Sequence, residues 1–221
     1  MDLIKDIIVK GLLGDLKIAE RSFRLNKKIK ELGKADLETS KKDISEILRD
    51  LSYTEMVLSL ARIYDNPNKK YPTRCLKRLY QVVKEADFQI DLKNYRSDSV
   101  LNLQYFGFDS IWIELLAKSY DIDFNRRTVG YFETQEVNEP LYSYIGKIKE
   151  VRDKLLAHNE DATVDSLIPY ASFESLLEHA KNVVSFYSLT YTGIRLKFGS
   201  DYYLADSTRN WENMYQEFIE S

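Results

Sequence analysis

Residues 141–159 read LYSYIGKIKEVRDKLLAHN, and the spacing of their apolar side chains decides the fold of this region. At about 100° per residue, one face of a helix collects six of them: Leu141, Tyr144, Ile145, Ile148, Val151 and Leu155. Pro140 suits the first position of such a helix, because proline has no backbone N–H to leave unpaired there. The segment therefore predicts a helix that begins at Pro140 and runs toward His158.

Helical spacing recurs along most of the chain, in which glycine (8) and proline (4) are scarce. It predicts five further helices: Leu12 to Phe23 with a stop at Gly33, Lys41 to Tyr64 before Asn66-Pro67, Pro72 to Ala86, a segment capped by Asp109, and a core helix from Phe173 to Tyr187. In the second of these, we expect one apolar stripe to face the core: Ile44, Ile47, Leu48, Leu51, Leu58 and Ala61. The fold class is therefore all-α, a helical bundle.

Two segments depart from this pattern. Asp121 to Glu139 is polar and irregular, so we expect a long loop there. Arg195 to Leu204 shows a weak alternation around Gly199 that is typical of a short hairpin. Trp211, Tyr215 and Phe218 then form the apolar stripe of a terminal amphipathic helix. We divide the chain into a helical domain, residues 1–193, and a C-terminal extension, residues 194–221.

Composition excludes several classes of protein. The 221 residues carry a net charge of −3, so a globally basic surface that coats nucleic acid is excluded and any RNA contact must be local. Cys75 is the only cysteine, and cysteine and histidine together are too few for a usual zinc site. The chain has no signal-peptide pattern and no apolar run long enough for a bilayer. We expect a cytoplasmic protein without a membrane partner.

Arg152 is the unusual residue of the 141–159 helix, because it falls within the apolar face. A guanidinium does not lose its charge, so it needs a carboxylate, a phosphate, a subunit interface or a wet cleft. Lys147, Lys154 and His158 project to a separate sector, about 120° away on a regular helix. Arg152 and His158 therefore meet on one ligand only if the helix breaks near Ala157, or if two copies of the chain combine.

The string Arg152-Asp153-Lys154-Leu155-Leu156-Ala157-His158 resembles the signature of the HEPN superfamily, an arginine with a polar neighbour followed by a histidine at the end of a helix. Together with Leu60-Ala61-Arg62-Ile63-Tyr64-Asp65, it resembles the AbiU-type abortive-infection branch more narrowly. The resemblance extends over about residues 41–193. It implies a helical bundle that dimerises, with motifs from both subunits lining one cleft that cleaves RNA without a metal or another cofactor.

The residue types suit that chemistry. In metal-independent cleavage the 2′-hydroxyl of RNA attacks the adjacent phosphorus, and an imidazole that titrates near neutrality can move the protons. His158 fits that role, and Arg152 fits the role of a phosphate ligand that stabilises the developing charge. Asp153 is a candidate for orienting a motif side chain. Lys154 and Lys147 are candidates for flanking phosphates, and Asn159 is a further supporting residue.

Each of these residues also has a purely structural interpretation. Arg152 can form an ion pair with a carboxylate on a neighbouring helix, and His158 can be a cation that caps the helix dipole. Asp153 and Lys154 can be solvent-facing charges. His179 lies off the apolar stripe of its helix, so we expect an exposed surface residue there.

The leading hypothesis is a dimeric HEPN endoribonuclease that acts in abortive infection, or as a toxin, on RNA such as tRNA. A second hypothesis is a non-catalytic HEPN module that dimerises and binds a partner protein or nucleotide; the terminal stripe of Trp211, Tyr215 and Phe218 supports it. A third is a toxin silenced by a cognate antitoxin, a nucleotidyltransferase that modifies a hydroxyl near the cleft.

Overall fold

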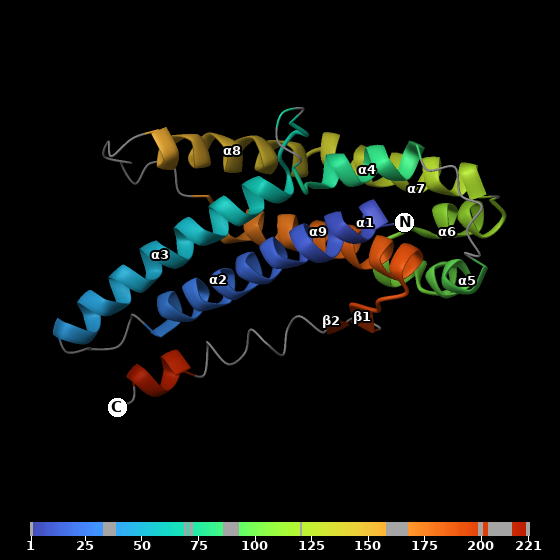
Figure 1. Ribbon diagram of the computed structural model, residues 1–221. Coiled ribbons are helices and arrows are strands. Elements are labelled where there is room, and N and C mark those ends of the chain that lie inside the picture. The colour runs from blue at the N-terminus through green and yellow to red at the C-terminus, as the bar shows by residue number, and fades with distance from the viewer. Residues whose placement is uncertain are drawn as a thin grey trace.

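The apolar spacing correctly predicts the fold class, since the chain folds as an all-α bundle (Figure 1). The computed structural model describes residues 2–32, 39–68, 70, 73–85, 93–119, 121–157, 168–198, 201–202 and 214–219. None of the helices in these ranges is long and apolar enough to cross a membrane. The elements, in chain order, are α1 (Asp2–Ile7), the π-helical turn η1 (Ile8–Leu12), α2 (Leu13–Leu32), α3 (Thr39–Ile63), α4 (Leu76–Glu85), α5 (Lys93–Leu101), the 3-10 turn η2 (Leu103–Phe106), α6 (Ser110–Ala117), α7 (Asp121–Val137), α8 (Leu141–Ala157), α9 (Tyr170–Thr192), and the strands β1 (Lys197–Phe198) and β2 (Asp201–Tyr202).

The N-terminal helix is one rod made of α1, η1 and α2, and it crosses the segment that leads into α4. Gly11 makes this crossing possible, because a Cβ at that position would lie 2.2 Å from Cβ of Arg74. Arg74 Nε in turn donates to Asp6 Oδ2 at 3.0 Å. Gly11 therefore lets the start of α4 sit directly against the rod.

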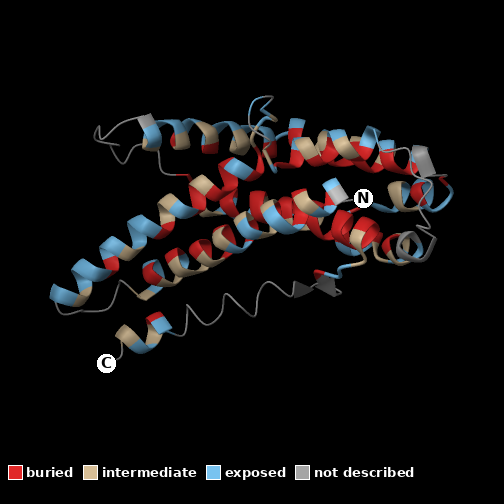
Figure 2. Cartoon of the chain, in the orientation of Figure 1, coloured by how far each residue is buried: buried red, intermediate tan, exposed pale blue. Residues whose placement is uncertain are grey.

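Helix α9 is the centre of the bundle, and its buried residues lie on all sides of its axis (Figure 2). The predicted core positions Phe173, Leu176, Val184 and Tyr187 are each at most 1% exposed. The helix ends at Gly193, whose φ of 67° favours glycine. The other helices pack around this rod, with α4, α7 and α8 along one side and α2 and α3 along another (Figure 1).

Helix α3 lies where the sequence predicts it, but the predicted inward stripe is wrong in its N-terminal half. Ile44, Ile47 and Leu51 are exposed, while Leu48 and Leu58 are partly buried and Ala61 is buried. The buried face of this half carries serines instead, and the amide nitrogen of Asn26 on α2 donates to Ser52 Oγ at 2.9 Å and to the carbonyl of Arg49 at 2.7 Å. Hydrogen bonds replace apolar contacts there, so the apolar stripe is left outside.

The predicted loop over Asp121 to Glu139 is also wrong, because residues Asp121–Val137 form helix α7. Its inward positions are spaced as in any amphipathic helix, but three of the seven are polar: Phe124, Asn125, Thr128, Val129, Tyr131, Phe132 and Glu136. Tyrosines hydrogen-bond to each of the three polar ones: Tyr191 to Asn125, Tyr187 to Thr128 and Tyr80 to Glu136. A buried polar face supplied by distant partners does not show in local hydropathy.

Some predicted helix ends are confirmed, whereas α4 begins at Leu76, four residues after the predicted start at Pro72. Asp109 caps α6 by accepting the backbone N–H of Trp112 at 3.0 Å. Helix α8 begins one residue later than predicted, at Leu141, and the carbonyl of Pro140 accepts the N–H of Tyr144 at 3.2 Å. Gly33, the predicted stop after the first helix, lies outside the described residues.

The C-terminal extension contains both predicted elements. Strands β1 and β2 pair antiparallel, with Lys197 opposite Tyr202 and Phe198 opposite Asp201. Residues 214–219 form a helical turn that docks on α3, where Tyr215, 4% exposed, donates from its hydroxyl to Ser45 Oγ at 2.7 Å. Trp211 lies outside the described residues. In this structure the terminal helix covers a surface of its own chain.

Candidate functional site

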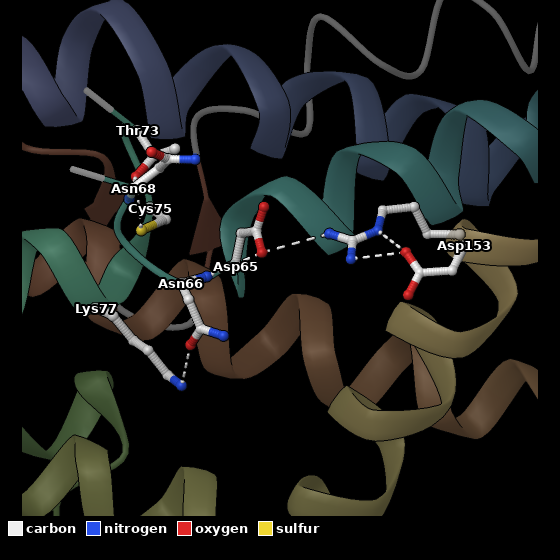
Figure 3. Close-up of polar contacts among 8 residues, drawn as sticks. Asp65, Asn66, Asn68, Thr73, Cys75, Lys77 and Asp153 are labelled. Atoms are coloured by element: carbon white, nitrogen blue, oxygen red, sulfur yellow. Dashed lines mark hydrogen bonds and ion pairs between the residues drawn. The ribbon is translucent and has the colours of Figure 1, made fainter. Parts of the chain in front are cut away.

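Arg152 lies on the side of α8 that meets the C-terminal end of α3. Two carboxylates reach the same guanidinium (Figure 3): Asp153 Oδ1 accepts from Nε at 2.9 Å and lies 2.8 Å from Nη2, and Asp65 Oδ1 lies 3.4 Å from Nη1. The side chain is 20% exposed. Burial alone would lower the pKa of Arg152, but Asp153 and Asp65 outweigh it and raise that pKa. The ion pair with a neighbouring helix, one of the structural interpretations of this residue, is thus present here.

The turn after α3 holds Asp65 in place. Asp65 Oδ1 also accepts the backbone N–H of Asn66 at 2.9 Å, and Asn66 Oδ1 accepts from Lys77 Nζ at 2.7 Å (Figure 3). A continuous chain of polar contacts therefore runs from Arg152 on α8 to Lys77 in the first turn of α4. Asp65 and Asn66 belong to the segment where the sequence predicts the end of α3.

The second motif residue lies beyond the described part of the chain. Helix α8 is described through Ala157, whereas His158 and Asn159 lie outside the described residues. The relation between His158 and Arg152 therefore stays a prediction, as do the roles of both His158 and Asn159.

The other predicted residues of α8 divide between two sides of the helix. Asp153, a candidate for orienting a motif side chain, contacts Arg152. Lys147 and Lys154 are exposed, about 140° to 160° around the helix from Arg152, which is farther than the 120° that holds for His158 on a regular helix. Lys154 pairs with Glu150 at 2.7 Å. These two lysines do not join the contacts around Arg152.

Lys149 is a cation beside Arg152 that the sequence reasoning missed. It lies one turn before Arg152 and is partly buried. Burial lowers the pKa of Lys149, and so do the charges of Lys77 and Arg152, while Asp65 and Glu136 act in the opposite direction. The spacing of three residues from Arg152 was the available sequence signal, since such residues share one side of a helix.

Glu136 on α7 is the second group that was missed, and it is only 7% exposed. The hydroxyl of Tyr80 donates to its Oε1 at 2.7 Å. Burial raises the pKa of Glu136 to about 7, against the opposing effects of the Tyr80 hydrogen bond and of Lys77 and Lys149. Because three of the seven inward positions of its helix are polar, nothing in the local sequence marks Glu136 as buried.

His179 is buried rather than exposed, which corrects the expectation from its place off the apolar stripe. It is 7% exposed, and its Nδ1 lies 2.9 Å from the hydroxyl oxygen of Tyr64. The Tyr64 hydroxyl also contacts the carbonyl of Leu176 at 2.7 Å. Burial lowers the pKa of His179 to about 4, so its ring is neutral near pH 7 and belongs to the core. The stripe misleads because the buried surface of α9 is wider than its apolar stripe and includes the position of His179.

Apolar side chains are exposed on the N-terminal half of α3 and near the end of α8. Counting at about 100° per residue, Ile44, Ile47 and Leu51 lie within about 60° of one another on α3. All three are exposed, in the half of α3 that diverges from α8 (Figures 1 and 2). Leu156, one turn after Arg152 on α8, is 68% exposed. We call Ile44, Ile47, Leu51 and Leu156 the apolar rim.

One protein-family model matches this chain. The family model HEPN_AbiU2, described as AbiU2, matches residues 43–214, from the second turn of α3 into the terminal helix. Neither the comparison with curated proteins nor the comparison with solved structures finds a match. The matched range includes Asp65, Lys149 and Arg152, and it extends past residue 193, where we placed a domain boundary from the sequence.

Proposed function

Because the chain belongs to the AbiU2 family of HEPN proteins, we propose that it is a metal-independent endoribonuclease of abortive infection. The family sets the context, a HEPN domain associated with abortive infection, and the reaction is our proposal. The observation that carries it is Arg152, a cation held at the meeting point of α3 and α8 only six positions before His158.

In the proposed reaction, His158 moves the protons and Arg152 holds the phosphate. The 2′-hydroxyl of RNA attacks the neighbouring phosphorus, so one base must accept its proton and one acid must protonate the leaving 5′-oxygen. A guanidinium with fixed orientation stabilises the extra negative charge of the phosphorane. Asp153 supports this role because it contacts both Nε and a terminal nitrogen of Arg152, which fixes the plane of the guanidinium.

We further propose that the active form is a homodimer in which two copies of the motif face one cleft. Members of the HEPN superfamily often form dimers, and the apolar rim supports this for the present chain. Four large apolar side chains, three on the N-terminal half of α3 and one on α8 one turn after Arg152, are exposed to water, and a second copy would cover them. In a dimer, His158 of the second copy can act with Arg152 of the first. The angular separation of about 120° between the two residues on one helix then no longer keeps them apart.

The catalytic proposal is tested by induced expression of the wild type, His158→Ala, Arg152→Ala and the control Arg126→Ala. Arg126 is an exposed arginine on α7. We expect growth arrest and fragmented RNA with the wild type and the control, and neither with the two motif variants. Intact RNA in all four strains, and no cleavage of single-stranded RNA or tRNA by the purified wild type, would refute the proposal.

The dimer is tested separately by sedimentation of Ile47→Asp and of the control Ile111→Asp. Ile47 is 60% exposed within the apolar rim, and Ile111 is 78% exposed on α6. A charge buried in an apolar interface is strongly unfavourable, so we expect the first variant to be monomeric and the second to remain dimeric. A monomeric wild type would contradict this part of the proposal.

One observation favours a second candidate function, a HEPN module that binds a partner without cleaving RNA. Each of the three nitrogens of Arg152 contacts Asp65 or Asp153, as expected for a structural ion pair. If Arg152 serves only in this ion pair, Arg152→Ala would lower the thermal stability of the protein and leave the growth arrest on induced expression unchanged. Loss of the phenotype at unchanged stability would favour the nuclease.

A further inference from the structure

Three cations lie between α8 and the start of α4, namely Arg152, Lys149 and Lys77. Two carboxylates, Asp65 and Asp153, contact Arg152. In the described part of the chain, Lys154, Lys84 and Lys10 each form an ion pair with a carboxylate. Within the described ranges, Lys77 donates to the neutral amide oxygen of Asn66 and forms no ion pair. Lys149 has no carboxylate within ion-pair distance among the described residues, although it is partly buried.

Lys77 and Lys149 also lie near each other and near Arg152. Lys77 is linked to Arg152 through Asn66 and Asp65, and Lys149 lies three residues before Arg152 on the same side of α8. In agreement with this placement, the charges of Lys77 and Arg152 both lower the pKa of Lys149. Like charges held together in a partly dry place destabilise the protein without a ligand, and an anion placed among them would relieve that repulsion. The cluster is therefore arranged as an anion site.

Arg152 itself has little capacity left for an anion in this state. Asp153 and Asp65 balance its charge and contact all three of its nitrogens, so a phosphate would compete with them for Arg152. Lys77 and Lys149 meet no such competition from a contacting carboxylate. Their positions make them the first cations available to an incoming ligand.

The other acidic groups around the cluster are either partly protonated near neutral pH or already held by an ion pair or a hydrogen bond. Glu136 reaches the cluster from α7, and because its pKa is about 7, it carries only part of a charge near neutrality. Glu133, also on α7, pairs with Lys84 at 2.7 Å. Asp65 is shared between Arg152 and the N–H of Asn66. The net charge left for a ligand is positive.

We propose that Lys149 and Lys77 form a phosphate subsite beside Arg152, which holds the RNA backbone at a phosphate next to the one that is cleaved. The ligand class rests on the proposed function, because RNA is the phosphate-bearing substrate of that reaction. Residues three apart on a helix have Cβ atoms about 5–6 Å apart, so the long lysine chain can reach a phosphate adjacent to that at Arg152. The subsite would anchor the strand while Arg152 exchanges Asp65 for phosphate.

Binding of a short, fluorescein-labelled 2′-O-methyl oligoribonucleotide tests this subsite, because that probe has no free 2′-hydroxyl to react. Anisotropy is measured over a range of salt concentrations for the wild type, Lys77→Met, Lys149→Met, Lys149→Arg and the control Lys17→Met. Lys17 is exposed on α2, away from the cluster. Each lost phosphate contact lowers the slope of log affinity against log salt by about 0.7.

We expect Lys77→Met and Lys149→Met to bind more weakly and each to lose about one such unit of slope. Lys149→Arg and Lys17→Met should keep the wild-type slope. Lys77 is exposed, so its variant carries the test even if Lys149→Met folds poorly. Wild-type affinity and slope in both methionine variants would overturn the subsite, whether or not the protein cleaves RNA.

The same measurement separates the subsite from the nuclease. Binding that depends on both lysines, in a protein that leaves cleavable RNA intact, supports the subsite and refutes the proposed reaction. If the wild type cleaves RNA and both lysine variants bind the oligonucleotide as the wild type does, the proposed reaction is supported and the subsite is refuted. A wild type that does not bind the oligonucleotide at all overturns the subsite.

Discussion

Two groups of polar residues lie within this bundle, and their partners differ in kind. Under α7, the buried Asn125, Thr128 and Glu136 are bonded to tyrosine hydroxyls, so neutral donors satisfy them inside the core. At the edge of α8, Arg152, Lys149 and Lys77 meet other charges, and these three cations exceed the two carboxylates, Asp65 and Asp153, that contact Arg152. The first group is closed and serves the fold, whereas the second has capacity for a ligand.

The largest effect that we expect from this comparison is that of Glu136→Gln on stability. Glutamine keeps an acceptor for the Tyr80 hydroxyl but cannot ionise. Burial raises the pKa of Glu136 from 4.5 to about 7, so ionising it in the folded protein costs roughly 3 kcal/mol. The cost is absent below pH 4.5, where the group is protonated in both states, and complete above pH 7.

Thermal or urea unfolding at pH 4 and pH 8 measures this effect. The variant should be more stable than the wild type at pH 8 by up to about 3 kcal/mol, with little difference at pH 4. If the wild type and the variant were equally stable at both pH values, Glu136 would have to stay solvated in the folded protein. The polar residues under α7 would then not be sealed from water. Glu133→Gln is the control, because Glu133 is more exposed and already paired with Lys84.

Tyr191→Phe should have a smaller effect on the same group. Tyr191 is 1% exposed and donates to Asn125 Oδ1, which is itself buried. An acceptor left without its donor in the core costs about 1–3 kcal/mol of unfolding free energy. Tyr187→Phe is the matched comparison, because the hydroxyl of Tyr187 lies 3.4 Å from Thr128 Oγ1 and should contribute less. A larger loss at Tyr187, measured by urea unfolding, would contradict this ranking.

The comparison also explains which elements could be predicted from the sequence. Helices α8 and α9 were predicted because their own apolar residues mark the buried face. Helix α7 was not, since tyrosines on α4 and α9 make polar residues acceptable in its core, and those partners are distant in sequence. For the same reason, the apolar stripe of α3 was assigned to the core, although Asn26 and the buried serines take that place.

The candidate site was predictable only where it is local. The string from Arg152 to His158 can be recognised in the sequence, and so can the contact of Asp153 with its neighbour. The partner Asp65 and the cluster of Lys77 and Lys149 depend on how α3, α4 and α8 meet in space. No spacing within one helix specifies such a meeting.

Asp65→Asn should give the smallest effect and the sharpest test of the charged group. Asp65 is more than one-third exposed, so its ion pair with Arg152 contributes less than about 1 kcal/mol to stability. Asp153 still holds Arg152 through two nitrogens, and removal of one nearby negative charge favours a phosphate by about 1 kcal/mol. We therefore expect roughly fivefold tighter binding of the 2′-O-methyl oligonucleotide at unchanged stability. Weaker binding would mean that Asp65 positions Arg152 rather than competing for it. Asp153→Asn, which loosens the guanidinium itself, should not show the same gain.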